Sequence, residues 1–503
     1  MSKFVNSREA TTSNLLLWSE KPTQVSIQET YDIKVWPATH IFNDGPINLT
    51  IPPQANGMLY SVDVVTKFKI ATGKDKGAID YNLSVVNNIA NAIWETVEVS
   101  VDDRLDLMQS MRNAYAYQTY FNTCLNGDSS HQDYLFATQL FHMDNGADKS
   151  ESEETEFLKE ADSTYTADQL TKDKAELAKR GYVPTGIRLA ALTHLVTPSW
   201  SPGWTEIDKD SVKTRVDHVA KNKGALARAS RVNKGQSVTV TAPLQCPLLT
   251  TGKCLPTNMK IRVTLNKNSD KFLLLTPTDS SATLEIEDVH LNVVYYRPRD
   301  GVLKAIEEQL VKEPAPYFLP KPEIIIKPIT GGNRVIRVTN VFNNKLPSYA
   351  FFCLQQSSHF EGARNGNPFA FIPFGKFQIF VNGTPHFVDP LEVEYELEGE
   401  KKIYRENYQY LVQLYKTIGK DLTGHCLINS ENFQLNFLAG VSFTADRSTT
   451  KDGYLNLQNT ANTYLEIDMD YDTSIPNDMV MVIYAIFDRQ IQIDSNRSIK
   501  IIE

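Results

Sequence analysis

Apolar and polar residues alternate in the same way in two distant parts of the chain. The first stretch, 94–103, reads Trp-x-x-Val-x-Val-x-Val-Asp-Asp, and the second, 374–383, reads Phe-x-x-Phe-x-Ile-x-Val-Asn-Gly. In each, an aromatic residue precedes apolar residues at a period of two, and a dipeptide that favours turns closes the run. A period of two places alternate side chains on opposite faces of a strand, so each stretch predicts a β-strand.

A tyrosine-rich segment follows each of these strands, at 115–125 in one case and at 404–412 in the other. We expect both segments to be helical. A strand-and-helix unit that recurs at a long spacing is typical of a duplicated domain. The pattern therefore predicts two related halves, and this duplication constrains the fold more than any single residue does.

Short runs rich in β-branched and aromatic residues, bounded by Gly, Asn or Asp, predict further strands. Each half closes on a long apolar strand, which is a second sign of duplication, and one short amphipathic helix is expected at 303–312. The rhythm as a whole predicts an all-β protein. The further strands are expected at 60–64, 68–70, 83–85, 238–240, 261–265, 284–286, 289–296, from 324 onwards, at 479–487 and at 491–493.

The domain organisation follows from length and from proline content. A chain of 503 residues exceeds the size at which one hydrophobic core stops growing, so two domains are expected. Residues 1–45 show little periodicity and predict an N-terminal arm with extended pieces. We expect the first domain at 46–312 and the second at 323–503, joined by a linker at 313–322, which holds four prolines.

The strand rhythm stops between about 145 and 215, where an acidic run, a surface helix expected at 166–180 and the pair Trp200 and Trp204 follow one another. A stretch of this length inside a β domain is uncommon unless it has a function, so we interpret it as a loop insertion in the first half. The two indoles either fold back on the domain or meet a neighbouring subunit, and the sequence favours neither. The basic residues of 221–234 fit a solvated loop better than a nucleic-acid contact, because no aromatic residues accompany them.

Composition narrows the class of protein. The formal net charge of −9 argues against a protein that coats nucleic acid, which needs a basic face or tail. The N-terminus has no apolar core of signal-peptide length, and no run approaches 18 apolar residues. We therefore expect no membrane span, and a protein that is made and kept in the cytosol or nucleus unless it leaves inside a particle. Five cysteines without a C-x-x-C pair indicate reduced, mostly buried thiols.

Candidate chemistry is sparse, and we expect no catalytic, cofactor-binding or metal-binding residues and no cofactor. Asp468, Asp470 and Asp472 match the first positions of a calcium loop, but Thr473 and Met479 replace the glycine and the glutamate that its geometry requires. The segment 233–237 lacks the upstream glycine of a phosphate-binding loop. The nine histidines have no paired spacing. An enzyme would need dispersed groups, such as the two carboxylates about 5–10 Å apart that glycosidases use.

Several short blocks, in this order and spacing, resemble the hexon-type major capsid proteins of Polinton (Maverick) elements and of adintoviruses. The resemblance touches both halves and covers most of the chain outside about 145–215, which departs from the family and fits a lineage-specific insertion. The blocks are Asn14–Gln24, Ile51–Pro53, Asn222–Gly224, Arg231–Ser237, Leu255–Val263, Asn268–Leu274, Asn367–Phe369, Val381–Gly383 and Val482–Asp488.

The resemblance implies a double jelly roll, that is, two eight-stranded antiparallel sandwiches in one chain. It also implies a homotrimer whose six jelly rolls form a pseudo-hexagonal capsomer of an icosahedral shell, with penton and minor capsid proteins as further partners. The protein would then be a virion component made in the host cytoplasm, with the nucleus as an alternative place of assembly. We hypothesise that the insertion forms a tower at the top of the trimer, with Trp200 and Trp204 at subunit contacts. The alternatives are a duplicated lectin-like β-sandwich binding protein and a minor capsid protein, although the latter usually holds one jelly roll.

Overall fold

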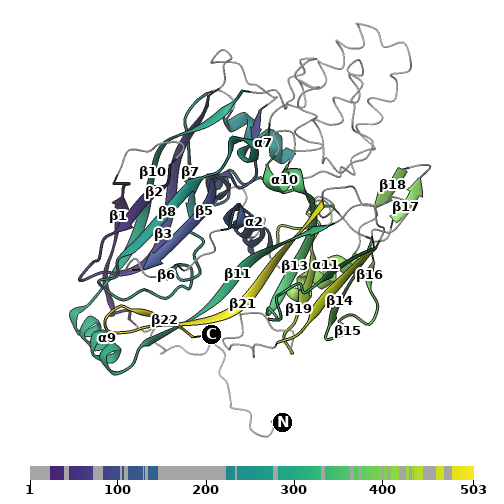
Figure 1. Ribbon diagram of the computed structural model, residues 1–503. Coiled ribbons are helices and arrows are strands. Elements are labelled where there is room, and N and C mark those ends of the chain that lie inside the picture. Colours follow the sequence, from purple (N-terminus) through teal and green to yellow (C-terminus); the bar gives the residue numbers. More distant parts are fainter. Residues whose placement is uncertain are drawn as a thin grey trace, which may run out of the picture.

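A computed structural model describes the chain from residue 23 to residue 502, with gaps (Figure 1). The described residues are 23–38, 45–71, 83–101, 105–106, 111–127, 130, 134–144, 223–232, 235–275, 281–329, 335–362, 367–372, 375–392, 395–398, 401–404, 408–418, 426–429, 433, 436–445, 460–468 and 479–502.

The first half of the chain forms two antiparallel four-stranded sheets, in the orders β1-β10-β3-β7 and β2-β8-β5-β6. A small pair, β4 and β9, lies beside them. The strands are β1 (Ile27–Val35), β2 (Ile47–Ile51), β3 (Met58–Ala71), β4 (Ser84–Val85), β5 (Trp94–Val101), β6 (Leu105–Asp106), β7 (Val238–Pro243), β8 (Ile261–Lys267), β9 (Leu274–Leu275) and β10 (Thr283–Pro298).

The second half repeats this arrangement, with sheets in the orders β11-β21-β13-β19 and β12-β20-β14-β15. Strand β22 adds to β21, strand β16 adds to β14, and β17 and β18 form a separate hairpin. The strands are β11 (Ala315–Ile329), β12 (Val335–Thr339), β13 (Tyr349–Gln356), β14 (Lys376–Val381), β15 (Thr384–Pro385), β16 (Leu391–Glu392), β17 (Tyr395–Glu398), β18 (Lys401–Tyr404), β19 (Ala439–Ser442), β20 (Thr463–Asp468), β21 (Met479–Ile493) and β22 (Ile499–Ile502).

The two halves have the same topology. When the eight sheet strands of each half are counted within that half, both halves show the orders 1-8-3-6 and 2-7-4-5. Two four-stranded antiparallel sheets joined in this way form a jelly roll, so the predicted double jelly roll is confirmed. The repeated sequence pattern falls on β5 and β14, which occupy equivalent places in their sheets. The expected duplication is therefore a property of the fold.

Helices cover the ends and one side of these sheets. Helix α2 follows β6 in the first half, and α11 holds the equivalent place after the strands β14 and β15 of the second half. The helices are α1 (Ile89–Ala92), α2 (Ala114–Asn126), the short 3-10 helix η3 (Ala137–Gln139), α7 (Lys223–Val232), α8 (Asp270–Leu273), α9 (Asp300–Lys312), α10 (Ser357–Glu361) and α11 (Tyr408–Thr417). The helices expected at 115–125 and 303–312 are thus confirmed.

The expected N-terminal arm at 1–45 is wrong for part of its length. Residues Ile27–Val35 form β1, which pairs with β10 from Pro298 back to Leu291. Its side chains do alternate, and Tyr31 stacks on Tyr295 of β10 with ring centroids 5.5 Å apart. The polar residues between the apolar ones obscure this period in the sequence, because β1 is an edge strand with a mostly exposed outer face.

The expected linker at 313–322 is also wrong, because Ala315–Ile329 form the long strand β11, paired with β21. The prolines of β11 are 316, 320, 322 and 328, so all of them have the same parity. Alternate residues of an antiparallel pair point their N–H groups toward and away from the partner strand. The prolines can therefore all lie at the positions of β11 that face away from β21. Because β11 is an edge strand, the missing N–H groups cost no hydrogen bond there.

Several other boundaries shift. The predicted strands 60–64 and 68–70 are one strand, β3, and 284–286 joins 289–296 as β10, with a register shift between Ile286 and Asp288. The strands 479–487 and 491–493 likewise join as β21. The second tyrosine-rich helix begins only at Tyr408, because Tyr404 ends the hairpin strand β18.

Some predictions lie outside the described residues. These are the insertion at 145–215 with its acidic run, the helix at 166–180, the pair Trp200 and Trp204, and residues 1–22 of the arm.

Candidate functional site: the junction between the two halves

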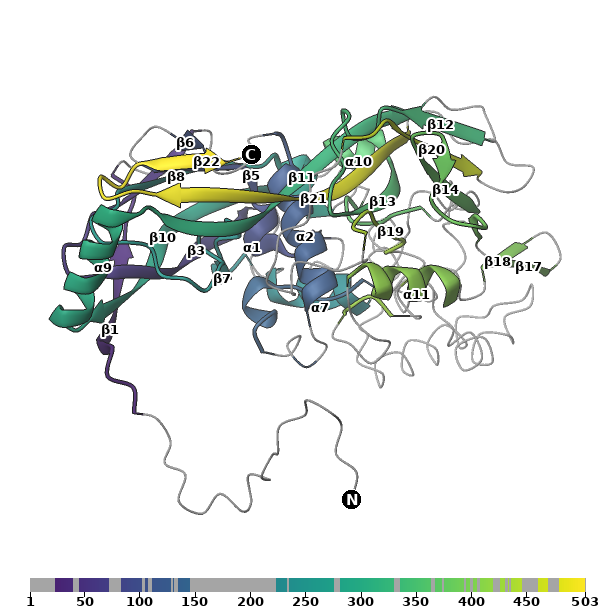
Figure 2. The ribbon, with the colours of Figure 1, turned by 90° about the horizontal axis from the view of Figure 1, so that it is seen from below.

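Helix α2 of the first half lies between the two jelly rolls (Figures 1 and 2). It covers the outer face of the β11–β21–β13–β19 sheet, the face opposite to the core of the second jelly roll. On the core face, Phe352 of β13 meets Phe377 of β14, with ring centroids 5.1 Å apart. On the outer face, Phe121 of α2 stacks on Tyr484 of β21 at 5.5 Å and on Phe371 at 5.4 Å. This sheet is therefore buried on both faces, and one continuous hydrophobic core runs through both halves.

The tyrosines of α2 carry the polar part of this contact. The Tyr117 hydroxyl lies 2.8 Å from Oε1 of Gln355 on β13 and 2.9 Å from the carbonyl oxygen of Pro368. The Tyr120 hydroxyl donates to Oδ1 of Asn436. Burial raises the pKa of Tyr117 well above its usual value, which keeps this hydroxyl protonated as a donor. Each tyrosine thus buries a ring and satisfies its hydroxyl across the junction.

A buried ion pair closes the junction at one end. Arg228 of α7 donates from Nη2 to Oδ1 of Asp144 at 2.8 Å, and the two side chains are 0% and 2% exposed. The remaining nitrogens of Arg228 donate to the carbonyl oxygens of Val85, at 2.9 Å, and His142, at 2.7 Å. Asn367 of the second half donates from Nδ2 to Oδ2 of Asp144 at 3.1 Å. Both charges are therefore paired and hydrogen-bonded, which is the condition under which burial is tolerated.

This ion pair corrects the interpretation of 221–234 as a solvated loop. Residues Lys223–Val232 form helix α7, and Arg228 faces the interior. Glycine is required near its start, because a Cβ at Gly224 would lie 2.5 Å from the carbonyl oxygen of Met143. The chain before residue 145 and the chain after residue 222 are therefore in direct contact.

Main-chain contacts tie the halves together at two further points. Asn113, just before α2, donates from Nδ2 to the carbonyl oxygen of Phe360 on α10 at 2.9 Å. The neighbouring Gly362 has a φ of +96°, and a Cβ there would lie 2.8 Å from the backbone nitrogen of Phe272. Only glycine meets both requirements. Further along, the backbone nitrogen of Leu427 donates to the carbonyl oxygen of Cys124 at 2.9 Å.

The long strands β11 and β21 extend the second half along the base of the first (Figure 2). The Tyr317 hydroxyl of β11 donates to the carbonyl oxygen of Cys254 at 2.8 Å. Arg497, between β21 and β22, binds both carboxylate oxygens of Glu307 on α9, at 2.6 and 2.8 Å. Partial burial would raise the pKa of Glu307, but the hydrogen bonds from Arg497 and Thr257 and the charge of Arg497 outweigh it and lower that pKa.

The remaining site predictions concern chemistry rather than assembly. Asp468 ends strand β20, whereas Asp470 and Asp472 lie outside the described residues, as do Asn233 and Lys234 of the phosphate-loop candidate. Within the described ranges, no three His, Cys, Asp or Glu side chains are grouped so as to hold a metal ion. In the same ranges, no helix combines the length and apolar character that crossing a membrane requires. All five cysteines are free thiols, and Cys124, Cys246 and Cys353 are buried.

Large apolar side chains remain exposed on the outside of both halves. Trp36 is 51% exposed and lies against His290 of β10, with ring centroids 4.4 Å apart. The others are Val25, Tyr134, Leu135, Val311, Phe318, Val335 and Val388.

Sequence reasoning identified the tyrosine-rich helix but none of its partners, because Gln355, Pro368 and Asn436 lie more than 200 residues away. It also missed the pair of Asp144 and Arg228. The one available signal was the place of Arg228 between Ala227 and Ala229, in a segment with helical spacing.

Known proteins match this chain in structure but not in sequence. No family model and no curated protein matches the sequence. Solved structures match it over almost its whole length. A chain of the Sputnik virophage structure has a TM-score of 0.54 at 10% identity, with 99% of this chain and 93% of that chain covered. The mavirus major capsid protein has a TM-score of 0.51 at 10% identity, with coverage of 100% and 96%. The PBCV-1 virus capsid has a TM-score of 0.50 at 11% identity, with coverage of 97% and 99%.

At these identities the likeness establishes a shared fold, the double jelly roll, which agrees with the resemblance found in the sequence. The closer relation to Polinton elements and adintoviruses stays a prediction.

Proposed function

We propose that this chain is a hexon-like major capsid protein, which assembles as a homotrimer into pseudo-hexagonal capsomers of an icosahedral shell. One observation carries the proposal. Two jelly rolls of identical strand order are fused through a buried junction, and the match to structures of the mavirus major capsid protein and the PBCV-1 capsid extends over nearly the whole length of each chain.

The physical advantage of the jelly roll is that its sheets are closed against each other. A jelly roll leaves only short sheet edges, which limits uncontrolled pairing between copies. The long edge strand β11 is protected by its prolines. Self-association must then use side chains rather than strand addition, and the exposed apolar residues of both halves, Trp36 among them, supply such a surface. A role of this kind requires no catalytic residues, places the protein in the virion, and makes other copies and penton or minor capsid proteins its partners.

The domain assignment becomes part of the proposal in a revised form. The first jelly roll extends from β1 to β10, and the second begins at β11 rather than at 323. We keep 145–215 as an insertion in the first half, since Asp144 and Gly224 on its two sides lie close together. We also keep Trp200 and Trp204 as subunit contacts at the trimer top.

Light scattering on the purified chain tests the proposal. Three copies of 56.8 kDa give about 170 kDa, and electron microscopy should show pseudo-hexagonal particles or larger assemblies of them. A stable monomer at high concentration would contradict it and would favour a duplicated β-sandwich binding protein instead. The double variant Trp200→Ala/Trp204→Ala should lower the trimer yield while the monomer remains folded. Unchanged assembly would remove the role given to the two indoles.

A further inference from the structure

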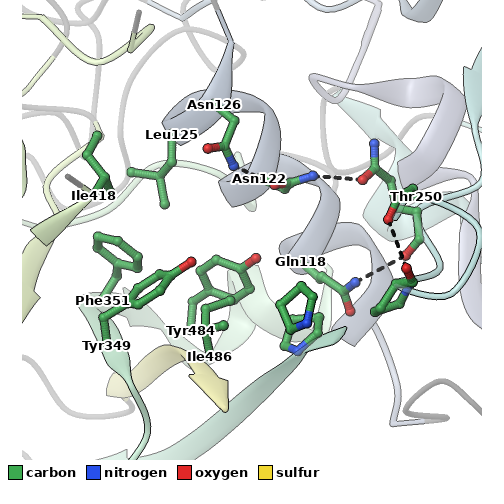
Figure 3. A pocket seen from close by; sticks show the side chains of 14 residues that line it. Gln118, Asn122, Leu125, Asn126, Thr250, Tyr349, Phe351, Ile418, Tyr484 and Ile486 are labelled. Atoms are coloured by element: carbon green, nitrogen blue, oxygen red, sulfur yellow. Dashed lines mark hydrogen bonds between the residues drawn. The ribbon is translucent and has the colours of Figure 1, made fainter. Parts of the chain in front are cut away.

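A pocket of about 180 Å³ lies at the junction, between α2 and the outer face of the β11–β21–β13–β19 sheet (Figure 3). Its floor is a patch of the sheet, where Pro322 pairs with Ile486 and Ile486 with Tyr349, and where Phe351 pairs with Tyr484 in the next row. One wall is α2, and a second wall is the segment after β7. The rim residues Asn126, Thr250 and Pro320 are exposed, so the pocket opens to the surface.

The chemistry of the lining is neutral, polar on one side and aromatic on the other. Among the described residues, no Asp, Glu, Lys, Arg or His lines the pocket. On the α2 side, Asn126 donates to Oδ1 of Asn122 at 2.6 Å, and Asn122 donates to Oε1 of Gln245 at 2.7 Å. Opposite these amides lie two tyrosines, a phenylalanine and two prolines. Such a lining offers nothing to an ion but suits a neutral ligand that carries both carbonyl groups and apolar surface.

One polar group in the pocket is left without a partner. Tyr484 is 5% exposed, and among the described residues its hydroxyl makes no hydrogen bond, whereas other buried tyrosines of the junction do. Figure 3 shows this hydroxyl pointing from the sheet toward α2, across the open space. Because this hydroxyl faces the pocket, it is available as a donor or acceptor to a ligand from outside the chain.

The size and the position of the pocket restrict the ligand. Pockets for drug-sized molecules have volumes of about 300–1,000 Å³, so this one fits one or two side chains of a peptide. Strand addition is disfavoured here, because the prolines remove N–H donors from the outward side of β11. A polyproline II segment needs no strand ladder. It presents unpaired carbonyls to amide and hydroxyl donors, and its proline rings pack on aromatic floors.

We propose that this pocket binds a proline-containing, polyproline II segment of another protein, with the Tyr484 hydroxyl and the Asn122 amide as donors to its backbone carbonyls. The ligand comes from a different chain, because the proline-dense stretch of this one is already fixed in β11. The inference goes beyond assembly, because the binding measurement applies to the monomer as well as to the trimer.

The test is fluorescence anisotropy with labelled decaproline as the probe and a Gly-Ser decapeptide as the negative probe. Wild-type protein should bind decaproline saturably and with little dependence on salt, because none of the described lining residues is charged. Tyr484→Phe keeps the ring and removes only the hydroxyl, so binding should weaken about fivefold. Asn122→Asp places a charge in the wall and should weaken binding more strongly.

Tyr295→Phe is the matched control. Tyr295 is also a buried tyrosine on the last strand of its jelly roll, but its hydroxyl donates to Pro52 and lies outside the pocket. This variant should bind like wild type, and thermal unfolding verifies that each variant is folded. If Tyr484→Phe fails to fold, Asn122→Asp decides the question. The proposal is overturned if decaproline does not bind saturably, if the pocket variants bind like wild type, or if trimerisation abolishes binding, which would show that a second copy fills the pocket.

Discussion

Strands β10 and β21 close equivalent jelly rolls, yet they are buried differently. In β10, from Val289 to Tyr295, fully buried residues alternate with half-buried ones, as expected for a sheet with one face toward the core. In β21, all residues from Met479 to Ile486 are buried. The outer face of the second sheet is covered, in part by α2, whose Phe121 stacks on Tyr484. Strands at the same place in the topology therefore show alternating burial when one face of the sheet is covered. They show continuous burial when both faces are covered.

The helices show the same asymmetry. In α2, only Asn122 and Asn126 are not buried, and its tyrosines bond to residues of both halves. In α11, buried residues occupy one side, and Tyr415 donates only locally, to the carbonyl oxygen of Ile428 at 3.1 Å. The two halves are thus similar units that differ in one helix. Of these two helices, it is α2 that packs its side chains between the halves.

The largest expected effect comes from breaking the polar end of that contact. Arg228→Met leaves the Asp144 carboxylate buried without its partner and should lower the free energy of unfolding by about 3–5 kcal/mol. Urea denaturation followed by circular dichroism measures it. Arg231→Met, on the exposed side of the same helix, should change the free energy by less than about 0.5 kcal/mol. Equal effects of the two variants would show that the buried pair does not hold the junction.

The two tyrosine-rich helices can be compared directly. Tyr117→Phe removes a buried hydroxyl that donates across the junction, so the free energy of unfolding should fall by about 1–3 kcal/mol. Tyr415→Phe on α11 removes a half-buried hydroxyl with one local partner and should cost less than about 1 kcal/mol. The same denaturation measurement applies to both. A larger loss for Tyr415 would contradict the asymmetry between α2 and α11.

A smaller effect is expected where β21 and β22 reach the first half. The pKa of Glu307 is lower in the folded protein than its ordinary value of 4.5. Its contribution is therefore present above that ordinary value and is lost as the pH falls through the folded value. Glu307 is 38% exposed, so screening limits the contribution to less than about 1 kcal/mol. Thermal unfolding of Glu307→Gln should differ from wild type near neutral pH and coincide with it in acid. A difference that persists in acid would assign the effect to packing instead.

The smallest effect is expected at the edge strand. Pro320→Ala restores an N–H that points away from β21, so the free energy of unfolding should change by less than about 0.5 kcal/mol. The same denaturation assay checks this value. A loss above 1 kcal/mol would mean that proline at this position does more than protect the edge.

The sequence predicts the strands and helices that follow from local periodicity. It does not predict the features that depend on contacts between distant residues. The strand at 94–101 and the helix at 115–125 were predicted from spacing alone, and so was their repetition in the second half. β11 was misassigned because proline content suggested a linker, although the shared parity of Pro316, Pro320 and Pro322 was already visible. The partnership of Asp144 with Arg228 could not be predicted, because its two members are 84 residues apart.

The contact between Met143 and Gly224 has a consequence for the history of the chain. Because Asp144 and Arg228 pair next to the two ends of the intervening segment, a change in the length of that segment costs loop-closure entropy but leaves this pair in place. Each doubling of a loop costs about 0.6 kcal/mol, which the buried core of two jelly rolls can absorb. The junction can therefore keep its structure when the segment between 145 and 222 changes in length. The arginine and the aspartate make this position a natural place for one lineage to differ from the next, and a practical one for displaying a peptide of choice.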